Sequence, residues 1–311
     1  MKLKTLLLLF ICTLFIGKQI STAQNIYSHA YGDRKNPALL YVHGGPRGNA
    51  TLFEGTTAKA LADKGYYVIV YDRRGEGRSA DANAKMTFDE AIADLNNLIK
   101  EYGVGKVSIL GHSFGGIVST LYTNAFPEKV ERLILVGALF SQQETYDHIL
   151  NTSLKIAIQR KDSITLRKID HIKSLDKNSA QYRKQTYEVA SHFDFFKMPS
   201  KTEESKKVAL EYENTFADSN IRNDNAPALF YQNESRVNID TRTILNDIKD
   251  KSVKLSAIYG RQDGIFSQKQ LSDLRKITGS SNFYMIENCS HYPFADQRTL
   301  FLQSVQEIMS K

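Results

Sequence analysis

Four near-continuous apolar runs alternate with helix-like segments in the first half of the chain. The runs are PALLYVH (37–43), YYVIVY (66–71), KVSILG (106–111) and ERLILVGA (131–138). Strands that are covered by helices on both faces have this composition. A strand that alternates with a helix implies right-handed crossovers and a mostly parallel sheet. These runs therefore predict an α/β fold with a parallel sheet flanked by helices.

The alternation of strands and helices stops near Phe140 and resumes after a long polar segment. Residues 141–235 are rich in polar and charged side chains and carry no strong strand signal. A helical insertion at this place would cover the carboxyl ends of the strands, where ligand sites in such sheets lie. The pattern resumes with a strand-like run at 252–260, a helix near 267–277, a second run at 282–288 and an amphipathic helix from about residue 297. The predicted organisation is an α/β core of residues 24–140 and 236–311 and a helical cap of residues 141–235.

The pentapeptide GHSFG, residues 111–115, lies between the apolar run KVSIL and the helix-like segment GIVSTLYTNAF. Glycine is costly inside helices and strands, so the three glycines around Ser113 need a reason. The sequence G-x-S-x-G between a strand and a helix is typical of a strained turn that exposes a nucleophilic serine. The N–H groups that begin the following helix then point at the negative charge that develops during attack. This context predicts a nucleophilic Ser113 rather than an ordinary glycine-rich turn.

A serine hydroxyl needs a general base, and the base needs an acid that orients it. His291 follows the last predicted strand, and Asp263 follows the strand before it. The order Ser113, Asp263, His291 is the order expected for this arrangement of strands. The other histidines lie in the insertion (His148, His171, His192), near the start of the chain (His29), beside the serine (His112) or in the HGGP motif (His43), and the nearby Asp247, Asp250 and Asp273 lie on predicted helices. We therefore predict a catalytic triad of Ser113, His291 and Asp263.

An oxyanion hole needs two hydrogen-bond donors. One predicted donor is the N–H of Phe114, directly after the nucleophile. The other is the N–H of Gly45 in YVHGGPRGN, the loop after the first predicted strand, with His43 as a buttress of that loop. In the loop after the second strand, Asp72, Arg74 and Arg78 are expected to form bracing ion pairs, and a role in substrate binding is the alternative.

These residues resemble the α/β-hydrolase superfamily over essentially the whole chain after residue 23. HGGP (43–46) and YDRRGEGRS (71–79) resemble the prolyl aminopeptidase branch, which typically has His-Gly-Gly-Pro-Gly and then Asp-Gln-Arg-Gly. The chain departs from that branch at Arg47, at Arg73 in place of glutamine and at Phe114 in place of tryptophan, and it contains no tryptophan at all. The resemblance implies a serine hydrolase that works through an acyl-enzyme.

In the peptidases that the chain resembles, carboxylates of the cap hold the free α-amine of the substrate. The segment KTEESKKVALEYENTF offers Glu204 and Glu211, which are seven residues apart and so share a helix face. Interleaved lysines are equally typical of a solvated helix, which leaves this assignment open. The resemblance favours an aminopeptidase-like hydrolase of a small molecule or short peptide. A carboxylesterase or lactone hydrolase is the alternative, and a ligand-binding protein that retains the fold is the non-enzyme alternative.

The first residues have the pattern of a signal peptide. Lys2 and Lys4 precede an apolar run, and Ser21 and Ala23 suit cleavage after residue 23. The run is shorter than the roughly 20 residues of a membrane span, although an uncleaved anchor is the alternative. We expect an exported bacterial protein in the periplasm or the medium, without stable membrane insertion after cleavage.

The remaining composition excludes several classes of partner. Loss of residues 1–23 removes three lysines and lowers the formal net charge from +7 to +4. The lysines and arginines form no dense run, so nucleic-acid binding is not expected. Only Cys12 and Cys289 are present, too few for a disulfide framework. The chain has no cluster with metal-ligand spacing and no nucleotide-binding glycine loop, so we infer no metal and no cofactor. The oligomeric state stays open.

Overall fold

The computed structural model describes residues 26–311. The predicted signal peptide of residues 1–23, its cleavage site and Cys12 lie outside the described residues. Within residues 26–311, no helix is both long enough and apolar enough to cross a membrane.

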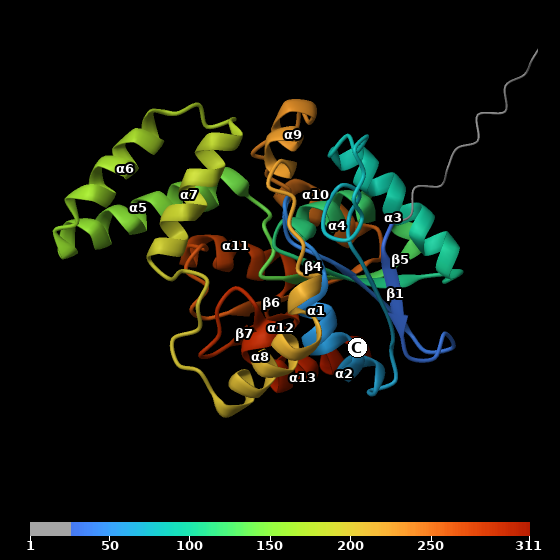
Figure 1. The fold of residues 1–311 in the computed structure, drawn as a ribbon. Coiled ribbons are helices and arrows are strands. Elements are labelled where there is room, and N and C mark those ends of the chain that lie inside the picture. Colours follow the sequence, from blue (N-terminus) through green and yellow to red (C-terminus); the bar gives the residue numbers. More distant parts are fainter. Residues whose placement is uncertain (1–25) are drawn as a thin grey trace, which may run out of the picture.

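A seven-stranded sheet runs through the molecule in the order β1-β3-β2-β4-β5-β6-β7 (Figure 1). The edge strand β1 pairs antiparallel with β3, and all other neighbours pair parallel. The strands are β1 (Ser28–Tyr31), β2 (Ala38–Val42), β3 (Tyr67–Tyr71), β4 (Val107–His112), β5 (Val130–Val136), β6 (Lys254–Gly260) and β7 (Phe283–Ile286). The prediction of a mostly parallel α/β sheet is therefore confirmed.

Helices cover both faces of this sheet because neighbouring strand residues point to opposite sides. Leu40 joins one apolar cluster, with side chains of α3, α4, α10 and α11, whereas Leu39 and Tyr41 join the other, with α1, α2, α12 and α13. The helices are α1 (Thr51–Phe53), α2 (Lys59–Ala62), α3 (Phe88–Tyr102), α4 (Phe114–Ala125), α5 (Gln142–Arg160), α6 (Ser163–Ser174), α7 (Ala180–His192), α8 (Glu203–Thr215), α9 (Ala226–Asn233), α10 (Arg242–Asp250), α11 (Gln268–Thr278), α12 (Pro293–Asp296) and α13 (Arg298–Ser310). A π-helical segment at Glu54–Ala58 joins α1 to α2, and 3-10 turns lie at Pro127–Lys129, Ala217–Ser219 and Ser280–Asn282.

The strands differ from the predicted runs mainly at their ends. The run 131–138 becomes a strand that stops at Val136, because Gly137 has φ +47° and turns the chain. The run 282–288 likewise stops at Ile286, before Asn288 with φ +48°. The sequence did not predict β1, whose four residues are only partly buried and carry no apolar run.

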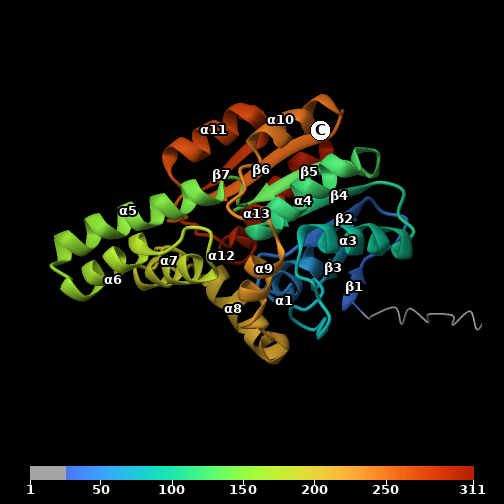
Figure 2. The same cartoon turned by 90° about the horizontal axis from the view of Figure 1, so that it is seen from above.

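The two ends of the predicted insertion lie side by side. Ser141 and Asp240 form an isolated antiparallel bridge, and the Thr241 N–H donates to the Phe140 carbonyl at 2.7 Å. Between these ends run the five helices α5–α9, which we call the insertion. Figure 2 shows α5, α6 and α7 projecting beyond one side of the sheet, and α8 contacts α12 and α13. That the insertion, residues 141–235, behaves as a separate cap stays a prediction.

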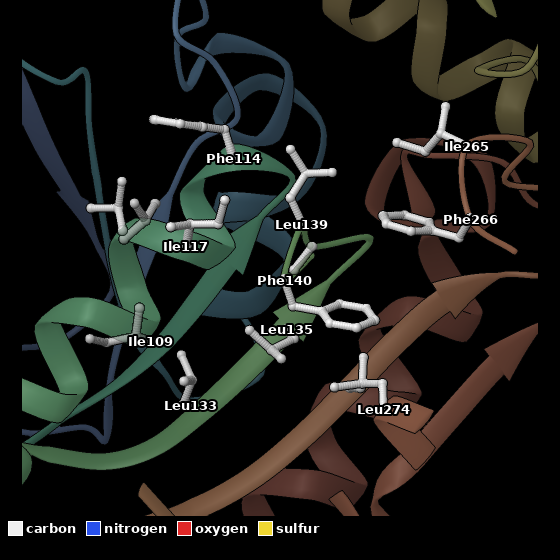
Figure 3. Packing of buried hydrophobic residues seen from close by; sticks show 14 of the residues in the cluster. Ile109, Phe114, Ile117, Leu133, Leu135, Leu139, Phe140, Ile265, Phe266 and Leu274 are labelled. Carbon is white, nitrogen blue, oxygen red and sulfur yellow. The ribbon is translucent and has the colours of Figure 1, made fainter. Parts of the chain in front are cut away.

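Buried side chains fix the segments that follow the central strands. Figure 3 shows Phe114 at the start of α4, Leu139 and Phe140 after β5, and Ile265 and Phe266 after β6, in one packed cluster. Each of these five side chains is less than 5% exposed. The carboxyl ends of the strands are therefore held in place by the core, and side chains on them have defined positions.

Candidate active site

Ser113 occupies the sharp turn between β4 and α4. Its φ of +52° and ψ of −124° lie in a region that only glycine adopts readily. For serine this backbone conformation costs on the order of 1–3 kcal/mol of conformational free energy. Main-chain hydrogen bonds hold the turn: the Ser113 N–H donates to Val136, and the Ser113 carbonyl accepts from Gly116 and Leu139. The end of β5 therefore supports the strained serine.

The glycines around Ser113 allow close approach of other segments. A Cβ on Gly115 would lie 2.2 Å from the carbonyl oxygen of Val42, and a Cβ on Gly116 would lie 2.3 Å from the Cβ of Ala138. Such distances exclude any side chain, so the turn packs directly against the segments that follow β2 and β5. This explains why glycines flank the serine, as the sequence predicted.

His291 and Asp263 form a buried pair at the ends of the next strands. Asp263 follows β6 and His291 follows β7, and His291 Nδ1 lies 2.8 Å from Asp263 Oδ2. Their side chains are 4% and 1% exposed. The Ile265 N–H donates to the other carboxylate oxygen of Asp263 at 3.3 Å. A carboxylate that accepts from Nδ1–H leaves Nε2 as the basic nitrogen of the imidazole.

Ser113 and His291 line one cavity of about 500 Å³ between the core and the insertion. Within residues 26–311, no group of three or more histidine, cysteine or acidic side chains could hold a metal ion. The core contributes Tyr41, Gly44, Gly45, Pro46, Arg47, Gly48, Asn49, Leu52, His112, Ser113, His291, Tyr292 and Phe294, and the insertion contributes Arg183, Tyr187, Phe196, Tyr212, Asn220 and Arg222. The structure thus brings the three predicted triad residues to one end of the sheet.

The predicted oxyanion donors belong to the two segments that flank Ser113. A Cβ on Gly44 would lie 3.0 Å from the Ser113 Cβ, so this loop contacts Ser113. The Gly44 carbonyl accepts from Arg73 Nη2 at 2.8 Å. Because the peptide bond between Gly44 and Gly45 is trans, the Gly45 N–H points away from this carbonyl and from Arg73. Phe114 is the first residue of α4, so its N–H has no acceptor within the helix.

His43 buttresses the loop of Gly44 and Gly45, as the sequence predicted. Its Nε2 accepts the Arg73 N–H at 2.9 Å, and its Nδ1 donates to the Gly44 carbonyl at 2.6 Å. Complete burial, together with the positive charge of Arg73, holds the pKa of His43 well below its ordinary value. The imidazole therefore stays neutral and keeps both hydrogen bonds.

Arg73 and Glu76 form a buried ion pair that sequence reasoning missed. Arg73 Nε donates to Glu76 Oε2 at 2.8 Å, and the guanidinium also donates to the carbonyls of His43 and Gly44. The other Glu76 oxygen accepts the N–H groups of Arg47 (2.6 Å) and Gly48 (2.9 Å). The arginine that departs from the prolyl aminopeptidase pattern therefore braces the loop of residues 44–48, which carries the predicted donor Gly45 and which we call the oxyanion loop.

The predicted ion pairs of the loop after β3 are present. Arg78 binds Asp72 at 2.7 Å and Glu54 at 2.7 Å, and Arg74 binds Asp94 at 2.6 Å. These pairs tie the loop to the π-helical segment and to α3. The bracing role predicted for Asp72, Arg74 and Arg78 is confirmed.

His112, next to Ser113, holds the loop that carries His291. Its Nε2 donates to the His291 carbonyl at 2.9 Å, and the two imidazole rings lie 4.9 Å apart. Burial and the neighbouring His291 lower the pKa of His112 to about 3, so this histidine stays neutral.

Glu204 and Glu211 share a face of α8, but that face meets α13 rather than the cavity. Glu204 accepts from the Thr299 hydroxyl at 2.6 Å, and Glu211 pairs with Arg298 at 2.7 Å. Neither carboxylate is among the residues that line the cavity. The residue of α8 that reaches the cavity is Tyr212, whose hydroxyl lies 3.3 Å from Thr51 Oγ1.

The cavity residues of the insertion were not found by sequence reasoning. Arg183 and Tyr187 lie four residues apart on α7, Phe196 follows α7, and Arg222 precedes α9. The only sequence signal is the i, i+4 spacing of Arg183 and Tyr187, which places them on one helix face. That face could be assigned to the cavity only from the packing of the insertion.

The family model of the alpha/beta hydrolase fold matches residues 37–297. The chain belongs to this family. The match spans both halves of the core and the insertion between them. It confirms the predicted resemblance to the α/β-hydrolase superfamily.

Relatives of this α/β-hydrolase include peptidases and esterases. A proline iminopeptidase of Neisseria gonorrhoeae is 29% identical over 123 residues, which are 38% of this chain and 38% of that protein. The matched segments span only 29–41% of the length of the curated relatives. A proline iminopeptidase-related protein of Thermus thermophilus has a TM-score of 0.65 at 22% identity, covering 92% of this chain and 93% of that chain. An esterase of Exiguobacterium antarcticum has a TM-score of 0.61 at 17% identity, covering 92% and 96%.

Proposed function

We propose that this α/β-hydrolase is a serine hydrolase of small acyl compounds. The observation that carries the proposal is the buried His291–Asp263 pair. His291 lines the same cavity as the strained Ser113. A strained serine, a base and an orienting acid at one edge of a sheet form the constellation needed for nucleophilic acyl transfer.

The proposed reaction has two stages. In the first, Ser113 Oγ attacks the carbonyl carbon while His291 Nε2 takes its proton, and the N–H groups of Gly45 and Phe114 stabilise the oxyanion. His291 returns the proton to the leaving group as the bond to it breaks, which leaves an acyl-serine. In the second stage, water gives a proton to His291 and attacks the acyl-serine, and His291 returns this proton to Ser113 Oγ as the acyl bond breaks, which releases the acid and restores both residues. Asp263 orients His291 and stabilises its charged form.

The cavity wall favours acyl esters as the substrate class. An aminopeptidase needs a carboxylate to hold the free ammonium of its substrate, since a buried charge requires a partner. Within residues 26–311, no aspartate or glutamate lines the cavity. We therefore propose a carboxylesterase-type or lactone hydrolase activity as the first candidate.

An aminopeptidase of the prolyl type is the second candidate. It is supported by HGGP at residues 43–46 and by the similarity to proline iminopeptidases. A ligand-binding role without turnover is the remaining alternative, because a fold hosts unrelated functions.

A substrate panel tests the proposal. Purified protein is assayed with 4-nitrophenyl acyl esters, lactones, and alanine and proline 4-nitroanilides with and without N-acetylation. We expect hydrolysis of short acyl esters that is lost in Ser113→Ala. Cleavage of free-amine anilides that collapses on N-acetylation would favour the aminopeptidase, and no turnover of any substrate would favour the ligand-binding role.

We also propose that the protein is exported, because the first 23 residues have the pattern of a cleaved signal peptide. N-terminal sequencing of protein from its native host should find a mature chain that begins near Gln24. Recovery of intact Met1 in a membrane fraction would contradict cleavage.

A further inference from the structure

The charged side chains of the cavity wall all carry the same sign. Arg47, Arg183 and Arg222 line the cavity, and no carboxylate of the described residues joins them. Arg47 is neutralised at the rim by an ion pair with the exposed Asp224. Arg183 and Arg222 have no ion-pair partner within residues 26–311. The cavity therefore presents two guanidinium groups without an ion-pair partner, that of the half-buried Arg183 and that of the exposed Arg222.

Arg183 reaches from α7 to the oxyanion loop. Its Nη2 donates to the Gly45 carbonyl at 2.7 Å, one residue beyond Gly44, which touches Ser113. Its Nε is buried and makes no hydrogen bond in the structure. A guanidinium has five N–H donors in a planar fork, so this side chain, which lines the cavity, has donors that no protein group uses.

The neighbours of Arg183 do not neutralise it, because the carboxylate of Glu76, whose charge acts on it, is already bound to Arg73. The guanidinium lies over the ring of Tyr187 at 5.0 Å. Burial raises the pKa of Tyr187 and of Tyr231 well above the ordinary value for tyrosine, so both phenols stay uncharged. A partly buried cation without a free anion beside it, and with unpaired N–H donors, lowers the stability of the fold unless a ligand supplies the missing charge and acceptors.

We propose that the cavity selects acyl substrates that carry a carboxylate a few bonds from the reacting carbonyl, with Arg183 as its main partner and Arg222 as the second. This inference rests on the proposed acyl hydrolysis and adds the substrate's charge. A carboxylate matches the planar fork of arginine and forms charge-assisted hydrogen bonds with it. The same positive charge repels a free ammonium group, which disfavours amine-bearing substrates.

Matched pairs of esters, one anionic and one neutral, test the proposal. The mono-4-nitrophenyl esters of succinic, glutaric and adipic acid carry a free carboxylate, and their methyl-capped counterparts differ only in that charge. In the wild type we expect kcat/KM for at least one free acid to exceed that of its capped partner by about 10-fold or more, mainly through KM.

Three variants assign the selectivity to its residues. Arg183→Gln should lower the ratio of free acid to capped ester by about 10-fold, and Arg222→Gln should lower it by about 3-fold. Arg183→Lys keeps the charge and should retain part of the ratio. Arg167→Gln removes an exposed arginine of α6 in the same insertion, away from the cavity, and should leave the ratio unchanged. Because the ratio is measured within each variant, a general loss of activity through the Gly45 contact cancels.

Binding of the same esters to Ser113→Ala separates the two proposals. Tighter binding of a free acid than of its capped partner, measured by calorimetry, supports the carboxylate site. If the wild type turns over neither ester, acyl hydrolysis is overturned, but this binding difference still supports the carboxylate site. Equal kcat/KM and equal binding for free and capped esters of all three lengths, or an unchanged ratio in Arg183→Gln, would overturn the carboxylate site while leaving acyl hydrolysis intact.

Discussion

The core and the insertion form opposite walls of the cavity and are held by different interactions. On the core side, Ser113 and the oxyanion loop are fixed by main-chain hydrogen bonds and buried ion pairs. On the insertion side, the walls are joined mainly by side-chain contacts, such as Arg183 on the Gly45 carbonyl and Ser290 Oγ on the Phe196 carbonyl at 2.7 Å, together with the main-chain hydrogen bond from the Gly264 N–H to the Phe195 carbonyl at 2.9 Å. We infer that the core determines the reaction and the insertion determines the substrate.

The largest loss of activity is expected in the core wall, for a substitution of Asp263, the acid of the proposed triad. Asp263→Asn should lower kcat by about 10⁴-fold, because the amide cannot hold His291 in the tautomer that accepts the serine proton. Steady-state kinetics on the best ester of the panel measures this loss. A decrease of less than about 10-fold would remove Asp263 from the proposed mechanism.

The Arg73–Glu76 pair tests how firmly the core wall is built. Arg73→Gln restores the residue of the prolyl aminopeptidase pattern but leaves Glu76 buried without its partner. We expect it to lower the free energy of unfolding by about 3 kcal/mol. Urea denaturation measures this loss, and the double variant Arg73→Gln/Glu76→Gln should recover most of it. A single variant as stable as the wild type would show that the pair does not stabilise the loop.

Buried neutral histidines of the core wall should make the protein less stable in acid. The pKa of His112 is about 3 in the folded protein and near 6.5 in the unfolded chain, so only the unfolded chain gains this proton as the pH falls below about 6.5. His112 alone then contributes a loss of about 2 kcal/mol between pH 8 and pH 5, and His43 acts in the same direction.

Denaturation curves of the wild type and His112→Gln at both pH values measure this effect. The variant should be less stable at pH 8 but should lose about 2 kcal/mol less on acidification. Equal losses in the two proteins would show that His112 is not held neutral by the fold.

The smallest effects are expected for the carboxylates of α8. Glu204 and Glu211 bind α13 in partly exposed contacts, and such contacts contribute about 1 kcal/mol or less. Glu204→Gln and Glu211→Gln should each leave kcat/KM within about 2-fold of the wild type. A collapse of alanine 4-nitroanilide cleavage in either variant would revive the aminopeptidase and move the amine site to α8.

The core wall could be predicted from the sequence because its determinants are local. The run KVSIL followed by GHSFG defines a strand and a turn, and Asp263 and His291 directly follow predicted strands. Parallel strands place such residues at one edge of the sheet, so their proximity follows from topology. Strand β1 was missed because a short, half-exposed edge strand lacks an apolar run.

The insertion wall could not be predicted because its residues act through tertiary packing. The spacing of Glu204 and Glu211 predicted a shared helix face, and that face exists, but nothing in the sequence says that it meets α13. Arg183 belongs to no motif, and only the position of α7 brings it to Gly45. Arg73 was seen as a departure from the family pattern, whereas its partner Glu76 explains it.

The most direct test of the central proposal is covalent labelling of the serine. The native protein is treated with a fluorophosphonate probe, and the modified residue is located by mass spectrometry of its peptides. We predict stoichiometric labelling at Ser113, no labelling in Ser113→Ala, and slow labelling in Asp263→Asn because His291 loses its orientation. An intact, folded wild-type protein that resists the probe, or that reacts at another residue, would contradict Ser113 as the nucleophile.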